Sequence, residues 1–325
     1  MGTAVILFGT TADGRDIHKI TLSAGDLTVS LLTWGAVLQD VRLAGVDRSL
    51  TLGSDSLSDY EGDMRYHGSL IGPVVNRIST ARVRLEGMVY ELERNEKGYI
   101  HLHSGAQGTH LQVWDIVEVT ENSATLSITL PDGLCGLPGH RQVTVTFAVT
   151  APANLTMRVT GQTDTKTLMN FANHSYWNLD GTDTWAGHQL CIAAERYLPG
   201  TDDAYPTGEI ADVSGTEMDF RTARKIAPGK PPLDNNFCLS DARTGLRDVL
   251  WLTGQSGVQM TMATTETGIQ IYDGRQAQRP GRGTYEGLAI EAQSWPDAPN
   301  HRGFPSIMLT PDALYQQITR WRFGK

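Results

Sequence analysis

Cysteine is scarce in this sequence, and long apolar runs are missing from it. Only three thiols occur among 325 residues, Cys135, Cys191 and Cys238, and no two of them are spaced as C-x-x-C. This usage indicates neither a disulfide framework nor a structural zinc site. The apolar run at residues 5–8 follows no basic segment and is far too short for a signal peptide or a membrane span. We therefore expect a soluble, cytoplasmic protein that does not bind membranes.

Positive charge is also in the minority. Lys and Arg together number 27 against 36 Asp and Glu, which gives a formal net charge of -9 at pH 7. A chain of this charge repels the phosphate backbone, so we expect no nucleic-acid partner. Hydrophobic residues make up 40% of the sequence, enough to bury a large core, which excludes disorder as the main state.

Alternating apolar residues predict strands along the whole chain. In residues 141–150, R-Q-V-T-V-T-F-A-V-T, every second side chain is apolar, and the alternation resumes at Leu155 after a turn-like Ala-Pro-Ala-Asn. These two runs predict a β-hairpin. Further strand-like runs lie at residues 27–32, 36–43, 124–130, 258–264 and 268–272.

Helical patterns are few and short. The best candidates, residues 57–64 and 221–226, cannot supply the crossover connections that a parallel sheet requires. The 34 Gly and 14 Pro residues suit many turns between short strands. We expect an all-β fold in which residues 1–325 form a single domain, a large antiparallel β-sandwich.

Several polar residues are candidates for chemistry. Glu291 is a lone carboxylate in the apolar run 288–293, so it must be ion-paired, shifted in pKa or catalytic. The segment 173–179, N-H-S-Y-W-N-L, is dense in polar groups; a hydrogen-bonded turn and a proton-transfer site both explain it. His101 and His103 would share a strand face, but a third metal ligand with convincing spacing is missing. No glycine spacing fits a phosphate loop, so neither a metal nor another cofactor is expected.

The sequence resembles the aldose 1-epimerase, or galactose mutarotase, family. The residues that carry the resemblance are the segments 72–78 (G-P-V-V-N-R-I), 101–105 (H-L-H-S-G), 173–179 and 291–300 (E-A-Q-S-W-P-D-A-P-N), with shorter matches between and after them. The resemblance implies a galactose mutarotase-like supersandwich. It also implies a cofactor-free isomerase that interconverts the α and β anomers of a free monosaccharide and exists as a monomer or homodimer.

The resemblance also assigns roles to individual residues. It implies that Glu291 is the general base and His174 the general acid, roles that a carboxylate and an imidazolium suit. The residues expected to bind the sugar are Asn76, Arg77, His103, Asp234 and Gln270, and those that could stack on it are Trp177 and Trp295.

Four positions depart from the family pattern. Pro73 stands in place of arginine, Ser104 of glycine, Asn235 of histidine and Ala292 of threonine. We expect these positions to border the pocket and to influence which sugar fits, because hydrogen-bonding sites discriminate strongly between hydroxyl patterns.

Two other functions remain open at this point. A non-catalytic sugar-binding or regulatory protein could keep the same fold and pocket. A hexose-6-phosphate 1-epimerase would need an arginine cluster to hold the phosphate, for which Arg77 alone is not enough. The further candidates for such a cluster are Arg275, Arg279, Arg282 and Arg302. Glycoside hydrolysis is disfavoured, because it needs two carboxylates and Asp234 is only a weak partner for Glu291.

Overall fold

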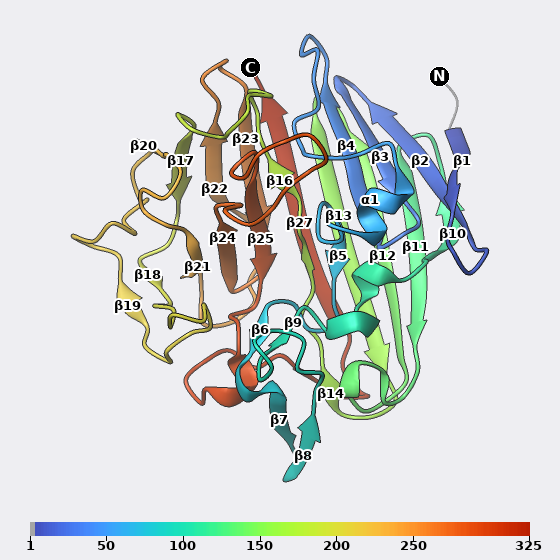
Figure 1. The fold of residues 1–325 in the computed structure, drawn as a ribbon, viewed down its shortest axis with the longest axis vertical. Coiled ribbons are helices and arrows are strands. Elements are labelled where there is room, and N and C mark those ends of the chain that lie inside the picture. The colour runs from blue at the N-terminus through green and yellow to red at the C-terminus, as the bar shows by residue number, and fades with distance from the viewer. Residues whose placement is uncertain (1–3) are drawn as a thin grey trace.

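Three antiparallel sheets carry most of the regular structure in the computed structural model, which describes residues 4–325 (Figure 1). The four-stranded sheet has the order β1 (Ala4–Thr10), β2 (Asp16–Ala24), β3 (Leu27–Leu32), β4 (Val37–Leu43). The nine-stranded sheet has the order β10 (Asp115–Val119), β11 (Ser123–Leu130), β12 (Arg141–Thr150), β13 (Asn154–Thr163), β27 (Tyr315–Gly324), β23 (Gln259–Thr264), β22 (Arg247–Thr253), β17 (Gln189–Ile192), β20 (Arg224–Lys225). The six-stranded sheet has the order β16 (Tyr176–Trp177), β25 (Leu288–Gln293), β24 (Gly268–Tyr272), β21 (Asp234–Cys238), β18 (Arg196–Tyr197), β19 (Ala211–Asp212).

Short strand pairs and turns complete the fold. The pairs are β5 (Leu70–Ile71) with β15 (Ala172–Asn173), β6 (Arg77–Ile78) with β9 (His101–Leu102), β7 (Arg82–Leu85) with β8 (Met88–Glu91), and β14 (Thr167–Leu168) with β26 (Met308–Leu309). Within residues 4–325, helical structure is limited to α1 (Leu57–Glu61) and the 3-10 turns η1 (Ser79–Ala81), η2 (Gly105–Gln107), η3 (Thr109–Leu111), η4 (Leu134–Gly136) and η5 (Ala298–Asn300). None of these helices has the length and apolar character needed to span a bilayer.

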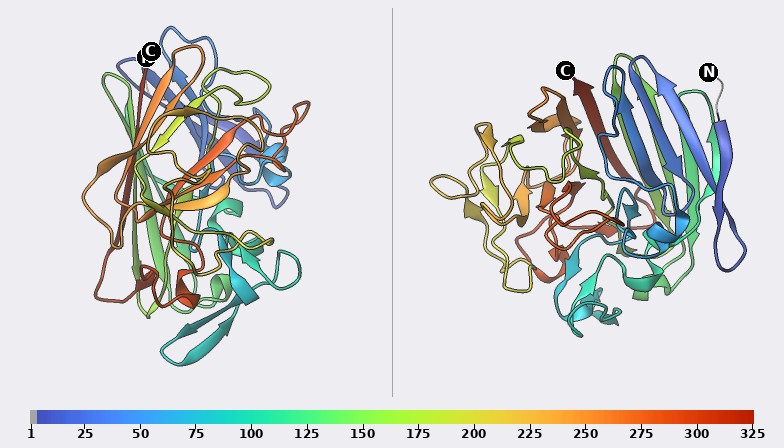
Figure 2. Two further views of the ribbon diagram at one scale, coloured as in Figure 1. Left: turned by 90° about the vertical axis from the view of Figure 1, so that its left-hand side faces the viewer. Right: turned by 45° about the horizontal axis from the view of Figure 1, so that its top comes forward.

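One apolar core joins the three sheets. Strand β12 alternates as predicted, with Val143, Val145 and Phe147 fully buried and the intervening threonines partly exposed. Its buried face packs in the same cluster as side chains of β2 and β3 from the four-stranded sheet and of β24 and β25 from the six-stranded sheet. The nine-stranded sheet therefore forms one layer and the two smaller sheets lie over its inner face (Figure 2). That residues 1–325 form a single domain stays a prediction.

The predicted strands are confirmed and one predicted helix is wrong. Strand β12 spans residues 141–150, pairs with β13 as a hairpin, and the five further predicted runs are strands to within one residue. Helix α1 covers only residues 57–61 of the predicted 57–64. Residues 221–226 are not helical, because Arg224 and Lys225 pair with β17 at the edge of the nine-stranded sheet. Sheet hydrogen bonds prevail there over a run too short to nucleate a stable helix.

The two predicted sugar-stacking tryptophans lie in the apolar interior. Trp177 is 0% exposed and packs against Trp321 and Phe323, with ring centroids 6.1 and 5.6 Å away. Trp295 is 1% exposed, and its indole N–H donates to the Thr267 carbonyl at 2.8 Å. Neither indole offers a face to a ligand, so the stacking prediction is wrong for both.

Replacing Trp177 tests this core assignment. Trp177→Ala is expected to lower the free energy of unfolding by about 3–5 kcal/mol, because it leaves a cavity among aromatic rings. The matched control is Trp251→Ala on β22, where the side chain is 38% exposed and the loss should be much smaller. Urea unfolding monitored by circular dichroism measures both, and equal losses for the two variants would contradict the assignment.

Candidate active site

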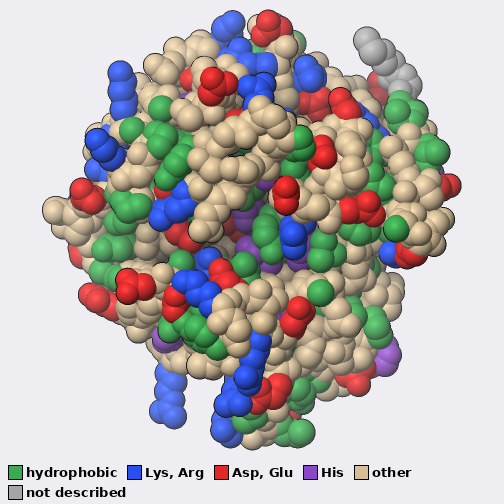
Figure 3. Space-filling view, in the orientation of Figure 1, with side chains coloured by type: hydrophobic (Ala, Val, Ile, Leu, Met, Phe, Trp, Pro, Cys, Tyr) green, Lys and Arg blue, Asp and Glu red, His purple; other side chains and the backbone are tan. Residues whose placement is uncertain are grey.

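A cavity of about 530 Å³ gathers most of the residues that the sequence marked for chemistry. Asn76, Arg77, His103, His174, Asp234 and Glu291 all line it, although they come from segments far apart in the chain. In the space-filling view, histidine side chains lie at the bottom of a hollow near the centre of the face (Figure 3).

Strand register in the six-stranded sheet builds the floor of this cavity. Tyr176 on β16 pairs with Ala289 on β25, and Glu291 on β25 pairs with Gln270 on β24. Residues two apart on a strand point to the same face, so Ala289 and Glu291 share the cavity side. His174 precedes Tyr176 by two residues, which brings its ring beside Glu291.

Glu291 and His174 form a buried acid–imidazole pair. His174 Nε2 lies 3.5 Å from Glu291 Oε1, and the residues are 3% and 2% exposed. Burial raises the pKa of Glu291 well above its usual value; Asp234 raises it further, and Arg77 opposes both. Burial lowers the pKa of His174 to about 4. Burial thus disfavours the charged form of both groups, so the imidazole is neutral at pH 7 and the carboxyl holds its proton to a higher pH than an exposed one.

His103 is held in one tautomer. Its Nδ1 accepts a hydrogen bond from the Asn76 backbone N–H at 3.1 Å, so the ring proton is on Nε2 and can be donated to a ligand. The ring lies edge-on to His174 at 5.3 Å and against Tyr66 at 4.8 Å. Burial lowers the pKa of His103 well below its ordinary value, so it acts as a neutral donor.

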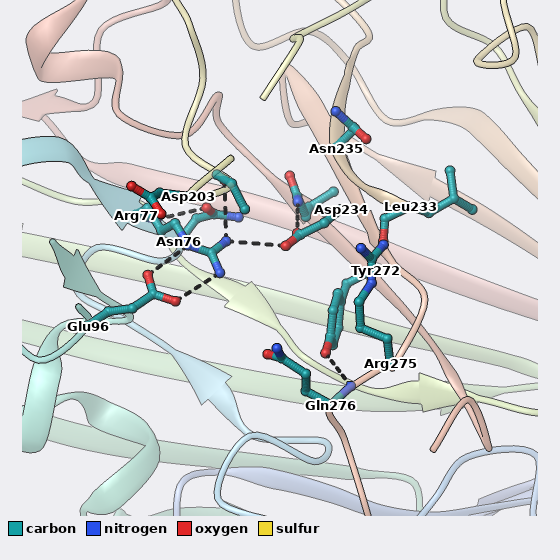
Figure 4. A network of polar contacts seen from close by, with 12 residues as sticks. Asn76, Arg77, Glu96, Asp203, Leu233, Asp234, Asn235, Tyr272, Arg275 and Gln276 are labelled. Carbon is teal, nitrogen blue, oxygen red and sulfur yellow. Dashed lines mark hydrogen bonds and ion pairs between the residues drawn. The ribbon is translucent and has the colours of Figure 1, made fainter. Parts of the chain in front are cut away.

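Arg77 links the two loops and the strand that form one wall of the cavity (Figure 4). Its guanidinium donates to both carboxylate oxygens of Glu96 at 2.8 and 3.1 Å. It also lies 3.5 Å from Asp234 Oδ2 and 3.4 Å from the Ala204 carbonyl. Burial raises the pKa of Asp234, and Arg77 and the Gln270 amide oppose that rise. Asp234 is therefore fixed in orientation by a cation and an amide at the cavity wall.

Gln270 reaches the site through Asp234 and does not itself line the cavity. Its Nε2 donates to Asp234 Oδ1 at 2.8 Å, and the cavity wall is formed without it. Gln270 is the cross-strand partner of Glu291 and faces the same side of the sheet, where its amide orients the Asp234 carboxylate.

The four departures from the family pattern do not border the cavity, so that expectation is wrong. Asn235 follows Asp234 and Ala292 follows Glu291, and neighbouring residues on a strand face opposite sides. The Asn235 amide accordingly donates to the Leu198 carbonyl at 3.1 Å, and Figure 4 shows it directed away from Arg77.

Ser104 and Pro73 contact the backbone of the cavity wall and do not contact the cavity itself. The Ser104 hydroxyl accepts from the Val74 N–H at 2.9 Å and donates to the Val74 carbonyl at 3.0 Å. The Pro73 carbonyl accepts from the Asn170 N–H at 2.7 Å. Both residues act on the shape of the backbone next to Asn76 and not on a ligand.

Several cavity residues escaped the sequence analysis. They are Asp63, Arg65, Tyr66, His67, Glu96, Lys97, Leu102, Tyr176, Asp202, Asp203, Ala204, Tyr272, Gln276, Ala277 and Gln278. Tyr272 could have been found, because it lies two residues after Gln270 on the same face of β24. Tyr66, His67 and Glu96 lie in irregular segments, where no periodicity marks the inward side.

The cavity does not form the arginine cluster that a sugar phosphate would need. Its cations are Arg65, Arg77, Lys97 and Arg275, and its carboxylates are Asp63, Glu96, Asp202, Asp203, Asp234 and Glu291. Lys97 pairs with Asp203, and Arg275 pairs with Asp273 at 2.8 Å. Arg279, Arg282 and Arg302 lie outside the lining.

His101 and His103 do not act together. The His101 ring nitrogen Nδ1 lies 2.7 Å from the Glu93 carbonyl, whereas His103 faces the cavity. Across residues 4–325, no three His, Cys, Asp or Glu side chains are grouped as a metal site would require.

Comparison with known proteins gives a consistent result. The family model described as aldose 1-epimerase matches residues 18–322. The chain is 31% identical to galactose mutarotase of Bos taurus over 95% of this chain and 94% of that protein. It is 30% identical to aldose 1-epimerase of Escherichia coli (strain K12) over 96% of each.

Solved structures agree with this relationship. The GalM/aldose epimerase homologue from C. elegans superimposes with a TM-score of 0.87 at 27% identity, covering 94% of this chain and 98% of that one. Galactose 1-epimerase from Lactobacillus acidophilus NCFM shares the fold, with a TM-score of 0.86. The expected supersandwich fold is confirmed. With its family model matched over nearly the whole length, this chain belongs to the aldose 1-epimerase family and is an isomerase that interconverts the α and β anomers of an aldose.

Proposed function

We propose that Glu291 is the general base and His174 the general acid of this isomerase. The observation that supports the proposal is the 3.5 Å separation of His174 Nε2 from Glu291 Oε1 on the cavity floor. Glu291 takes the proton from the anomeric hydroxyl while His174 gives a proton to the ring oxygen. The bond between C1 and the ring oxygen breaks, and C1 becomes an aldehyde.

The return step runs with the roles reversed. After rotation about the C1–C2 bond, the C5 hydroxyl attacks the other face of the aldehyde. His174 removes the proton from that hydroxyl, and Glu291 returns a proton to the oxygen on C1. The pair ends with the proton it started with, so the cycle needs no external acid, base or redox partner.

The shifted pKa values strengthen both groups. A carboxylate whose pKa is raised by burial is a stronger base than one in water, and an imidazolium whose pKa is lowered is a stronger acid. The productive form carries the single proton on His174 instead of Glu291.

The remaining cavity residues orient the sugar. Arg77 and His103 donate hydrogen bonds, Asp234 accepts them, and Asn76 holds the His103 tautomer through its backbone. Tyr66 and Tyr272 line the cavity and supply the aromatic faces that the two tryptophans do not. We propose that an uncharged aldose is the ligand. The cytoplasmic location and the choice between monomer and homodimer stay predictions, and analytical ultracentrifugation decides the latter.

Replacing the base tests the central assignment. Glu291→Gln keeps shape and hydrogen bonding but removes the proton acceptor, so kcat should fall by about 10²-fold or more. Polarimetry on freshly dissolved pure anomers measures the rate, and calorimetry should still detect sugar binding. Glu118→Gln, at an exposed site on β10, is the matched control. A folded Glu291→Gln variant with a near wild-type rate would contradict the proposed general base and would show that Glu291 has only a structural role.

The pH dependence tests the shared proton. Activity requires a single proton on the pair. On the acid side kcat/KM should therefore fall near pH 4, where His174 becomes protonated while Glu291 is also protonated, so that the pair holds two protons. It should fall again on the alkaline side, above the ordinary carboxyl range, as the pair loses its last proton through the raised pKa of Glu291. Subtracting the uncatalysed rate at each pH isolates the enzyme. An acid limb centred on the ordinary histidine pKa would argue against the shared proton.

Replacing Asn235 tests whether this departure from the family pattern affects which sugar is preferred. Because its amide faces away from the cavity, Asn235→His is expected to leave the ranking of sugars by kcat/KM unchanged. A polarimetric panel of hexoses, pentoses and deoxy sugars measures that ranking. A reordered ranking would show that position 235 reaches the ligand.

A further inference from the structure

His67 is a buried titratable side chain in the cavity that the proposed proton transfers do not use. It is 2% exposed, lines the cavity, and stacks on Tyr176 with ring centroids 4.3 Å apart and an interplanar angle of 29°. Its Nδ1 is enclosed and has no hydrogen-bond partner among residues 4–325. The other ring nitrogen, Nε2, is not enclosed in this way.

The position of His67 is fixed relative to the proposed acid. The N–H of the next residue, Gly68, donates to the His174 carbonyl at 3.0 Å, which ties this segment to His174. The Tyr176 ring contacts His67 on one side and His174 at 5.1 Å. Glu291 lies on the strand beyond His174. The Tyr176 ring therefore contacts both His174 and His67.

The chemistry of His67 suits a hydroxyl group. Burial, together with His174 and Arg279, lowers the pKa of His67 to about 3, so the ring is neutral at physiological pH. A neutral imidazole offers one donor and one acceptor. Nδ1 is enclosed, which leaves Nε2 as the nitrogen that can meet a ligand. A sugar hydroxyl can either donate to this nitrogen or accept from it.

We propose that His67 binds the hydroxyl of the exocyclic group on C5 of the sugar and so selects hexoses that carry a C6 hydroxyl. This inference rests on the proposed roles of Glu291 and His174. The ring oxygen is bonded only to C1 and C5. With Glu291 at the C1 hydroxyl and His174 at the ring oxygen, the group beyond His174 is the substituent on C5.

The other neighbours of His174 are committed elsewhere. His103 is fixed by Asn76 beside Arg77 and Asp234, on the wall that faces the ring hydroxyls. Tyr66 packs against His103, His110 and His174 with its ring. His67 is thus the cavity histidine that stacks on Tyr176 and has no role in the proposed proton transfers.

A combined change of residue and substrate tests the inference. His67→Phe keeps an aromatic ring on Tyr176 but removes the polar nitrogens. The substrates are D-galactose with D-fucose, its 6-deoxy form, and D-glucose with 6-deoxy-D-glucose, because the preferred hexose is a separate question. The variant should lower kcat/KM about 10-fold for the hexose, the effect of one lost hydrogen bond, and about 2-fold or less for the 6-deoxy sugar.

Two further measurements make the outcome unambiguous. His67→Gln restores a hydrogen-bonding group and should recover part of the preference for the hexose, and thermal unfolding checks that both variants fold. An equal loss for hexose and 6-deoxy sugar, or no loss for either, overturns the proposal. The proposal is also overturned if the effect of His67→Phe on kcat/KM disappears with a 2-deoxy sugar instead of with the 6-deoxy sugar. Failure of the proposed function would show separately, as full activity in Glu291→Gln.

Discussion

The site depends on a carboxylic acid and an imidazole that are kept out of water side by side. Burying a lone charged carboxylate would cost a large part of the net stability of any domain. Burial reduces that cost for Glu291 and His174, whose side chains lie 3.5 Å apart, by raising the pKa of the carboxyl and lowering that of the imidazole, which favours the neutral form of each. The same burial makes the carboxylate more basic and the imidazolium more acidic. Stability and reactivity therefore have one physical origin here.

Strand alternation decides which neighbours serve this pair and which serve the core. Tyr176 lines the cavity and the next residue, Trp177, packs in the interior. In the same way Glu291 faces the cavity and Ala292 faces the core, and Asp234 faces the cavity while Asn235 does not. A one-residue slip of β25 would exchange the two faces. The apolar core on one side of the six-stranded sheet is thus what holds the catalytic register on the other.

Most of the fold and half of the site could be predicted from the sequence, for reasons visible in particular residues. The period-two pattern of β12 is strong because one face is fully buried and the other is threonine-rich. The resemblance located the six residues that meet in the cavity, from Asn76 to Glu291. It failed for Trp177 and Trp295, since an indole in a polar motif carries no mark of the side it faces. Tyr66 and His67 were missed because their segment is irregular and only the tertiary structure turns it inward.

The charges around the cavity select an uncharged ligand before any single hydroxyl is recognised. Arg77 is held by Glu96 in a two-point contact and by Asp234, Lys97 by Asp203, and Arg275 by Asp273. A phosphate dianion would have to compete with these carboxylates for the cations, and Arg65, whose Nε donates to the Gly62 carbonyl, is the lining cation that has no carboxylate partner within residues 4–325. The unpaired carboxylates of the lining would also repel it. A neutral sugar meets the same groups as fixed donors and acceptors and disturbs none of the pairs. We propose that the ion pairs of the wall therefore also favour an uncharged substrate.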